Sequence, residues 1–98
     1  MTDPRIEKLA GVLVHYSTAV EPDDKVIIIG DELAAPLLKA VYAEVLKAGG
    51  HPLMQVSLSG IEEIFYEHAS QDQLLHVSDP LKIALETYDV RIRIGGEA

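Results

Sequence analysis

Several residues in this chain could take part in chemistry, but their spacing does not form a recognisable catalytic set. The chain has four histidines, His15, His51, His68 and His76. A metal site on a helix needs ligands three or four residues apart on one face, and no two of these histidines have that spacing. Asp72 lies four residues from both His68 and His76, but a helix break expected at Ser70 separates it from His68. His76 also has Asp79 three residues on, but Ser78-Asp79-Pro80 is expected to be a turn. We therefore expect no metal site formed by this chain alone.

Two carboxylates lie in the turn Gly30-Asp31-Glu32, directly after a segment expected to be a strand. Ligands of α/β proteins bind at this kind of turn. Phosphate binding there requires glycines for close backbone approach and a helix N-terminus without negative charge. This turn has one glycine and two carboxylates, so we expect no nucleotide there. Asp31 and Glu32 are interpreted instead as residues that favour the positive end of the next helix.

Two further groups of charged residues follow a pattern. Glu62, Glu63 and Glu67 share one short predicted helix, where acidic residues in the first turn are ordinary. A carboxylate pair for acid–base chemistry is the alternative, and it would need a cleft. Arg91 and Arg93 alternate along the last predicted strand and suit a carboxylate partner, either in this chain or beyond its end. We assign no catalytic, cofactor-binding or metal-binding residue.

The first half of the chain predicts a helix, a strand and a second helix. Asp3-Pro4 opens a helix expected to end near residue 20. Its apolar stripe is predicted at Ile6, Leu9, Leu13, Tyr16 and Val20. The first strand is predicted over 25–30, and its residues 26–29 are apolar on both faces, which is typical of a central strand in a parallel sheet. The second helix is predicted over 33–48, with Pro36 in its first turn and a glycine pair at its end.

The second half predicts a strand over 52–58, a helix over 61–69, a helix over 81–86 and a strand over 90–94. Ser70 is expected to cap a further turn over 71–75, and Ser78 with Pro80 is expected to start the helix over 81–86. Crossovers between parallel strands are right-handed, and the most apolar strand should be central. The sequence therefore predicts an α/β fold with a short three-stranded parallel sheet in the order 2-1-3. Helices are expected on both faces, as in half of a Rossmann-like fold.

Length and composition narrow the class of protein. The 98 residues allow one domain, covering 1–98. Its third strand has no helix after it and Met1 looks like a natural start, so we expect the N-terminal part of a longer chain. The net charge of −8 disfavours nucleic acid and anionic lipid as partners. The chain has no cysteine and no long apolar run, and its charged start leads us to expect no signal peptide. These features favour the cytoplasm.

Four segments resemble the N-terminal domain of the thermophilic metallo-aminopeptidases, the aminopeptidase T and aminopeptidase S family. These segments are MTDPRIEKLAGVLVHYS, VIIIGDELAAPLLKAVYAEVLKAGGHPL, EEIFYEHAS and VRIRIGG. They follow one another in register along almost the whole chain. None of them is a catalytic signature, so the resemblance rests on their common order.

The resemblance implies a parent enzyme that removes N-terminal residues from peptides with two divalent metal ions, zinc, cobalt or manganese. It also implies that the metal ligands and the catalytic carboxylate lie in a C-terminal domain, and that the enzyme is a cytoplasmic homodimer. This chain would then be a non-catalytic domain that frames the active-site cavity and supports assembly, and would be inactive alone. The alternative is a free-standing small α/β module that binds a partner or a small ligand, for which the exposed edge of the third strand is suited.

Overall fold

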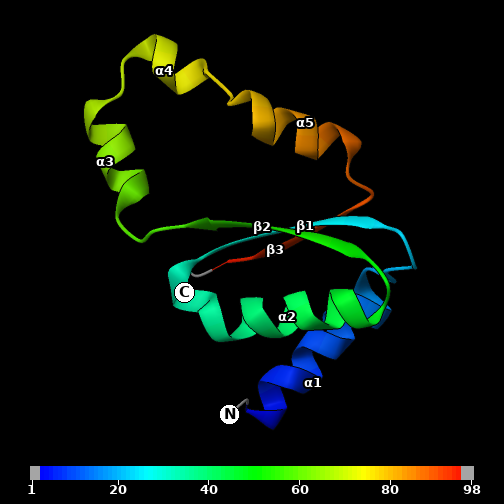
Figure 1. The fold of residues 1–98 in the computed structure, drawn as a ribbon. Coiled ribbons are helices and arrows are strands. Elements are labelled where there is room, and N and C mark those ends of the chain that lie inside the picture. Colours follow the sequence, from blue (N-terminus) through cyan, green and yellow to red (C-terminus); the bar gives the residue numbers. More distant parts are fainter. Residues whose placement is uncertain (1–2, 96–98) are drawn as a thin grey trace.

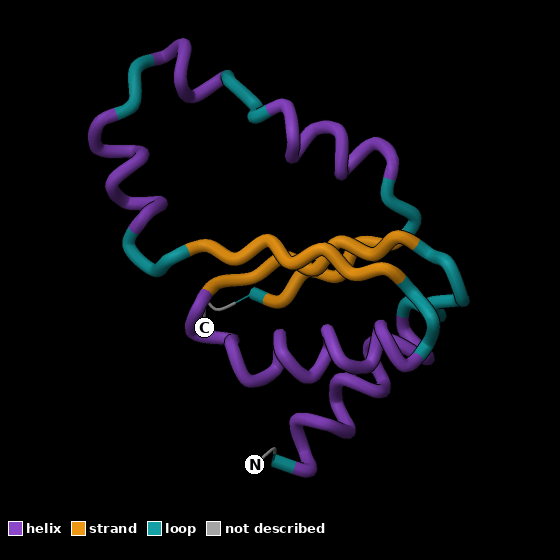
Figure 2. Tube along the Cα trace, viewed as in Figure 1, coloured by secondary structure: helices purple, strands orange, loops and turns teal. Residues whose placement is uncertain are grey.

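A three-stranded parallel sheet forms the middle layer of the computed structural model, which describes residues 3–95 (Figures 1 and 2). The strands are β1 (Lys25–Asp31), β2 (His51–Ser57) and β3 (Val90–Ile94). They lie in the order β2-β1-β3, and β1 pairs in parallel with both neighbours. The predicted α/β fold and the strand order 2-1-3 are therefore confirmed.

The first helical segment consists of α1 (Pro4–Val12) and a π-helical turn (Leu13–Ser17). The carboxylate of Asp3 caps it by accepting a hydrogen bond of 2.8 Å from the backbone N–H of Arg5. The predicted apolar stripe is wrong at two positions, because Leu9 is 47% exposed and Tyr16 is 82% exposed. Ala10 and Val14 are buried instead. These smaller side chains face the core and permit close packing against the next helix.

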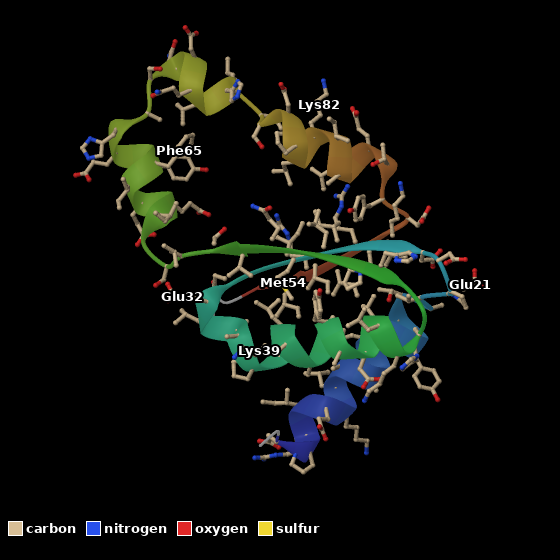
Figure 3. The ribbon with its side chains drawn as sticks, viewed as in Figure 1. Glu21, Glu32, Lys39, Met54, Phe65 and Lys82 are labelled. Carbon is tan, nitrogen blue, oxygen red and sulfur yellow. The ribbon has the colours of Figure 1, made fainter. Side chains whose placement is uncertain are left out.

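The core lies between this helical segment, the sheet and α2 (Ala35–Lys47), which follows a 3₁₀ turn (Glu32–Ala34). Pro36 falls in the first turn of α2, as predicted, where no intrahelical hydrogen bond is lost. The buried residues of this layer are Ala10, Val14, Val20, Val26, Ile28, Leu38, Val41, Val45 and Ile92. Figure 3 shows Met54 of β2 on the side of the sheet that α2 covers. The alternate residue Ile27 is also buried, so β1 is covered on both faces, as a central strand should be.

Two glycines bring segments close together. At Gly30, an added Cβ would lie 2.9 Å from Cδ2 of Leu38 and 3.1 Å from the carbonyl oxygen of Ile94. Gly30 therefore allows α2 and the end of β3 to approach β1. Gly49 ends α2 with φ of 86°, a left-handed conformation that favours glycine.

The opposite side of the sheet carries α3 (Ile61–His68), α4 (Gln71–Leu75) and α5 (Asp79–Thr87). They form an arc from the end of β2 to the start of β3 (Figure 1). Ser70 forms a capping box with Gln73, which fixes the start of α4 as the sequence predicted. Helices therefore lie on both faces of the sheet. No helix among residues 3–95 has the length and apolar character needed to cross a membrane.

The arc is packed much less tightly than the other helical layer. In α5, Ala84 is buried, and Leu81 and Leu85 are half-buried. Every residue of α3 and α4 is exposed. The large apolar side chains left exposed along the arc and its entrance are Leu58, Ile61, Ile64, Phe65, Tyr66, Leu74, Leu75, Val77 and Ile83. The sheet face beneath the arc is therefore covered mainly by α5.

Candidate functional site

The carboxyl edge of the sheet brings together the turns after β1 and β2. Asp31 Oδ1 accepts a hydrogen bond of 2.9 Å from the backbone N–H of Leu33 and so caps the 3₁₀ turn, in agreement with its predicted role. Glu32 Oε1 accepts hydrogen bonds from the backbone N–H of Ser59 at 2.7 Å and from its hydroxyl at 2.9 Å. Glu32 thus links the ends of the two strands (Figure 3).

The charge of Glu32 is favoured by these contacts. The backbone N–H of Ser59, and then its hydroxyl, lower the pKa of the Glu32 carboxyl. An ionised Glu32 beside Asp31 makes this edge negative, which disfavours a phosphate group there. Sequence reasoning did not identify the Glu32–Ser59 contact, because the two residues are 27 positions apart and meet only when β1 and β2 pair. We interpret this edge as a structural connection.

The histidines are distributed over separate contacts. His15 Nε2 lies 3.0 Å from Glu44 Oε1, and His51 Nε2 lies 3.4 Å from Asp23 Oδ1. His68 and His76 line one pocket of about 520 Å³ in the arc, together with apolar residues such as Phe65. In the described part of the chain, no group of three His, Cys, Asp or Glu side chains is placed to hold a metal ion. These residues therefore do not fit a metal centre, and we derive no metal chemistry from them.

Glu44 of α2 joins two helical segments through its carboxylate. One oxygen contacts His15 of the π-helical turn at 3.0 Å, and the other accepts a hydrogen bond of 3.0 Å from Lys47 Nζ. Its side chain is only 17% exposed. The hydrogen bond from Lys47, followed by that with His15, lowers the pKa of Glu44. This network holds the first helical segment against α2 and is far from the sheet face beneath the arc.

The sheet face beneath the arc contains the most suitable candidate site. Arg91 and Arg93 both lie on this face of β3, as their alternation predicted, while Ile92 between them is buried on the opposite face. A pocket of about 250 Å³ is lined by Ile29, Gln55, Ser57, Leu81, Leu85, Arg91 and Arg93. We call these seven residues the arginine pocket. Its polar groups come from β2 and β3, and its apolar wall comes from β1 and α5.

Pairing among the strands explains how this pocket forms. Ile29 of β1 is in register with Gln55 of β2 on one side and with Arg93 of β3 on the other. Gln55 and Arg93 are thus separated by two strand spacings, roughly 10 Å between backbones. The sequence predicted the two arginines but not Gln55 or Ser57. The only available signal for these was their position in the second strand, which becomes informative once the register is known.

Comparison with known proteins places the whole of the described fold in one family. The family described as thermophilic metalloprotease (M29) matches residues 2–98. None of the curated proteins compared with the chain matches it. The family match agrees with the resemblance carried by the four sequence segments and covers the helices, the sheet and the arginine pocket together. The chain therefore belongs to the thermophilic metalloprotease family.

Proposed function

We propose that this chain is the non-catalytic N-terminal domain of a metal-dependent aminopeptidase that removes N-terminal residues from peptides. In that enzyme the domain frames the active-site cavity and supports assembly of a cytoplasmic homodimer. The observation that carries the proposal is the family match over residues 2–98. Because the match covers this α/β unit from its first helix to its third strand, the family function provides the best account of the whole unit.

The distribution of metal-ligating side chains supports the proposal that the metal ions are bound by a different domain of the enzyme. A metal-bound water needs a ligand set that fixes the metal and leaves a coordination position open. Residues 3–95 bring together no such set. Under the proposal, a C-terminal domain supplies the ligands for two divalent ions, zinc, cobalt or manganese, and the present domain supplies walls and contacts.

The surface of the domain supports a role in assembly. Leu75 is 83% exposed, Tyr66 is 67% exposed and Leu58 is 62% exposed, all on or beside the arc. Large apolar side chains that stay exposed in such number are typical of a surface that another protein part covers. Both outer strands, β2 and β3, also have one unpaired edge in the described sheet. A catalytic domain or a second subunit would cover part of this surface.

A direct test compares two products in one peptidase assay. The first protein is the purified 98-residue chain. The second is a longer protein, expressed from this coding sequence together with whatever coding sequence follows it in the gene. With added cobalt, zinc or manganese, the longer product should release N-terminal residues from short peptides, lose activity with a chelator and have the solution mass of a dimer. The chain alone should be inactive. Metal-dependent turnover by a homogeneous sample of the chain alone would contradict its non-catalytic role.

The alternative function is a free-standing α/β module that binds a small ligand or a partner. The arginine pocket also suits this alternative, because two cationic side chains and two polar ones line a single pocket. If the reading frame ends after residue 98 and the chain is a stable monomer without peptidase activity, the binding module is the better account.

A further inference from the structure

Arg91 and Arg93 place two positive charges side by side on one face of an edge strand. Residues two apart on a strand point to the same face, and their backbones are roughly 7 Å apart. Both side chains are exposed, although the chain carries 16 acidic residues and only eight basic ones. Among residues 3–95, no carboxylate lies within 4.0 Å of either guanidinium. The two arginines are therefore available to an anion that the described residues do not provide.

The surroundings of these charges are those of a ligand pocket. Gln55 and Ser57 contribute an amide and a hydroxyl from the opposite outer strand, and no carboxylate lines the arginine pocket. Leu81 and Leu85 of α5 form an apolar wall, together with Ile29 in the floor. A small number of polar groups opposite apolar side chains is the usual composition of a ligand site.

The size and charge of the pocket restrict its ligand. Its volume of about 250 Å³ is smaller than the roughly 300–1,000 Å³ of typical ligand pockets, so it suits one amino-acid residue better than a nucleotide. Guanidinium groups bind carboxylates with two parallel hydrogen bonds, which a lysine ammonium cannot form. The net charge of −8 also opposes a phosphate dianion more strongly than a carboxylate with a single charge.

We propose that the arginine pocket binds the carboxylate of a short peptide. The guanidinium groups of Arg91 and Arg93 bind this carboxylate, and the apolar carbon atoms of the peptide residue that carries it pack against Leu81 and Leu85. This inference rests on the proposed function, because it assigns to the domain a subsite for the peptide on which the parent enzyme acts. The carboxylate can be the C-terminus of the peptide or an acidic side chain. The shared requirement is a planar carboxylate carried by a residue with apolar carbon atoms.

The test uses three N-acetylated tripeptides and the purified chain. The first ends in leucine with a free carboxylate, the second is its C-terminal amide, and the third is an amide with glutamate as its last residue. Binding is followed by amide chemical shifts in ¹H–¹⁵N spectra, with inorganic phosphate as a separate titrant. The free acid should shift the amides of residues 55–57 and 91–94, with a dissociation constant in the range of about 1 mM. The leucine amide should bind about tenfold more weakly, since hydrogen bonds to a charged group are lost.

Substitutions identify the residues responsible. Arg91→Gln and Arg93→Gln should each weaken binding of the free acid about tenfold, and Arg93→Lys should weaken it less. Lys82→Gln is the matched control, because this substitution also removes one positive charge but does so outside the arginine pocket. Lys82 extends from α5 away from the sheet (Figure 3). It should change the dissociation constant less than about twofold. Circular dichroism of each variant should match that of the unsubstituted chain.

The outcomes discriminate among ligands. If only the glutamate peptide binds, the proposed carboxylate chemistry holds and the carboxylate recognised is an acidic side chain. If the glutamate peptide binds as well as the free acid, the pocket accepts a carboxylate from either source. Equal binding of the leucine amide, equal shifts with inorganic phosphate, or no shift of residues 91–94 at several millimolar peptide would each overturn the proposal. These results are independent of the peptidase assay, so the pocket can fail while the aminopeptidase assignment stands, and the reverse also holds.

Discussion

Gly49 ends α2 in a conformation that alanine adopts only with strain. Its φ of 86° lies in the left-handed region, where an L-residue with a Cβ pays about 1–2 kcal/mol. The space around Gly49 is also restricted. An added Cβ would lie 3.2 Å from Cα and 3.3 Å from Cβ of Pro22, closer than the roughly 3.5–4.0 Å of a favourable carbon–carbon contact.

Pro22 cannot move away freely, because the next residue ties this turn to Gly49. The backbone N–H of Asp23 donates a hydrogen bond of 2.9 Å to the carbonyl oxygen of Gly49. We therefore expect Gly49→Ala to lower the free energy of unfolding by about 2 kcal/mol, combining strain and contact. For a domain of this size, that loss corresponds to a fall in Tm of about 8–16 °C.

Urea denaturation followed by circular dichroism measures this loss, and Gly11→Ala is the matched control. Gly11 lies in α1 with no atom within 4 Å of an added Cβ. The same substitution there should stabilise the protein by about 0.5–1 kcal/mol, because alanine favours a helix. Opposite signs at the two positions support the reasoning. A neutral or stabilising effect of Gly49→Ala would refute it, since neither the backbone strain nor the contact with Pro22 would then have the stated cost.

Three further predictions concern the remaining contacts. The pKa of Glu44 is lowered, so its stabilisation exists above the ordinary carboxyl pKa and is lost as the pH falls through the lowered one. Glu44→Gln should therefore reduce the free energy of unfolding by up to about 1 kcal/mol at neutral pH and leave it unchanged in strong acid, as measured by urea denaturation. Ser59→Ala removes one of two donors to Glu32, so the pKa of Glu32 should rise while staying below its ordinary value, as a ¹³C NMR titration would show. Val41→Ala in the core, where Val41 is 0% exposed, should cost about 2–3 kcal/mol. In contrast, Ile83→Ala on the arc, where Ile83 is 59% exposed, should stay within about 0.5 kcal/mol.

The sequence alone predicted the elements whose signals are local. The β-branched, apolar run Val26–Ile29 indicated the central strand, because only a strand covered on both faces tolerates it. Ser70 and Ser78 marked helix starts through side chains that bond to nearby backbone groups. The glycine at position 49 marked a helix end. From these signals the strand order followed as well, and the family resemblance added what no local pattern contains.

Other features depended on contacts between distant segments. Periodicity indicated that the first helix is amphipathic, but Tyr16 is exposed and Ala10 is buried because packing against α2 selects the face with smaller side chains. The sequence pattern predicted the helix over residues 61–69 and a further turn over 71–75, but it did not reveal that their apolar side chains stay exposed. Propensity describes how a segment folds, whereas burial depends on what lies against it.

The arginine pocket illustrates the same division. The sequence by itself determined that Arg91 and Arg93 share one face of the last strand, because alternation is a local property of an extended chain. Only the tertiary structure decided that Gln55 is in register with Ile29 and Arg93 across the sheet, and that Leu85 lines the same pocket as these residues. Strand register and helix placement arise from pairing between segments far apart in the chain, and a shift of one residue would turn each side chain to the opposite face.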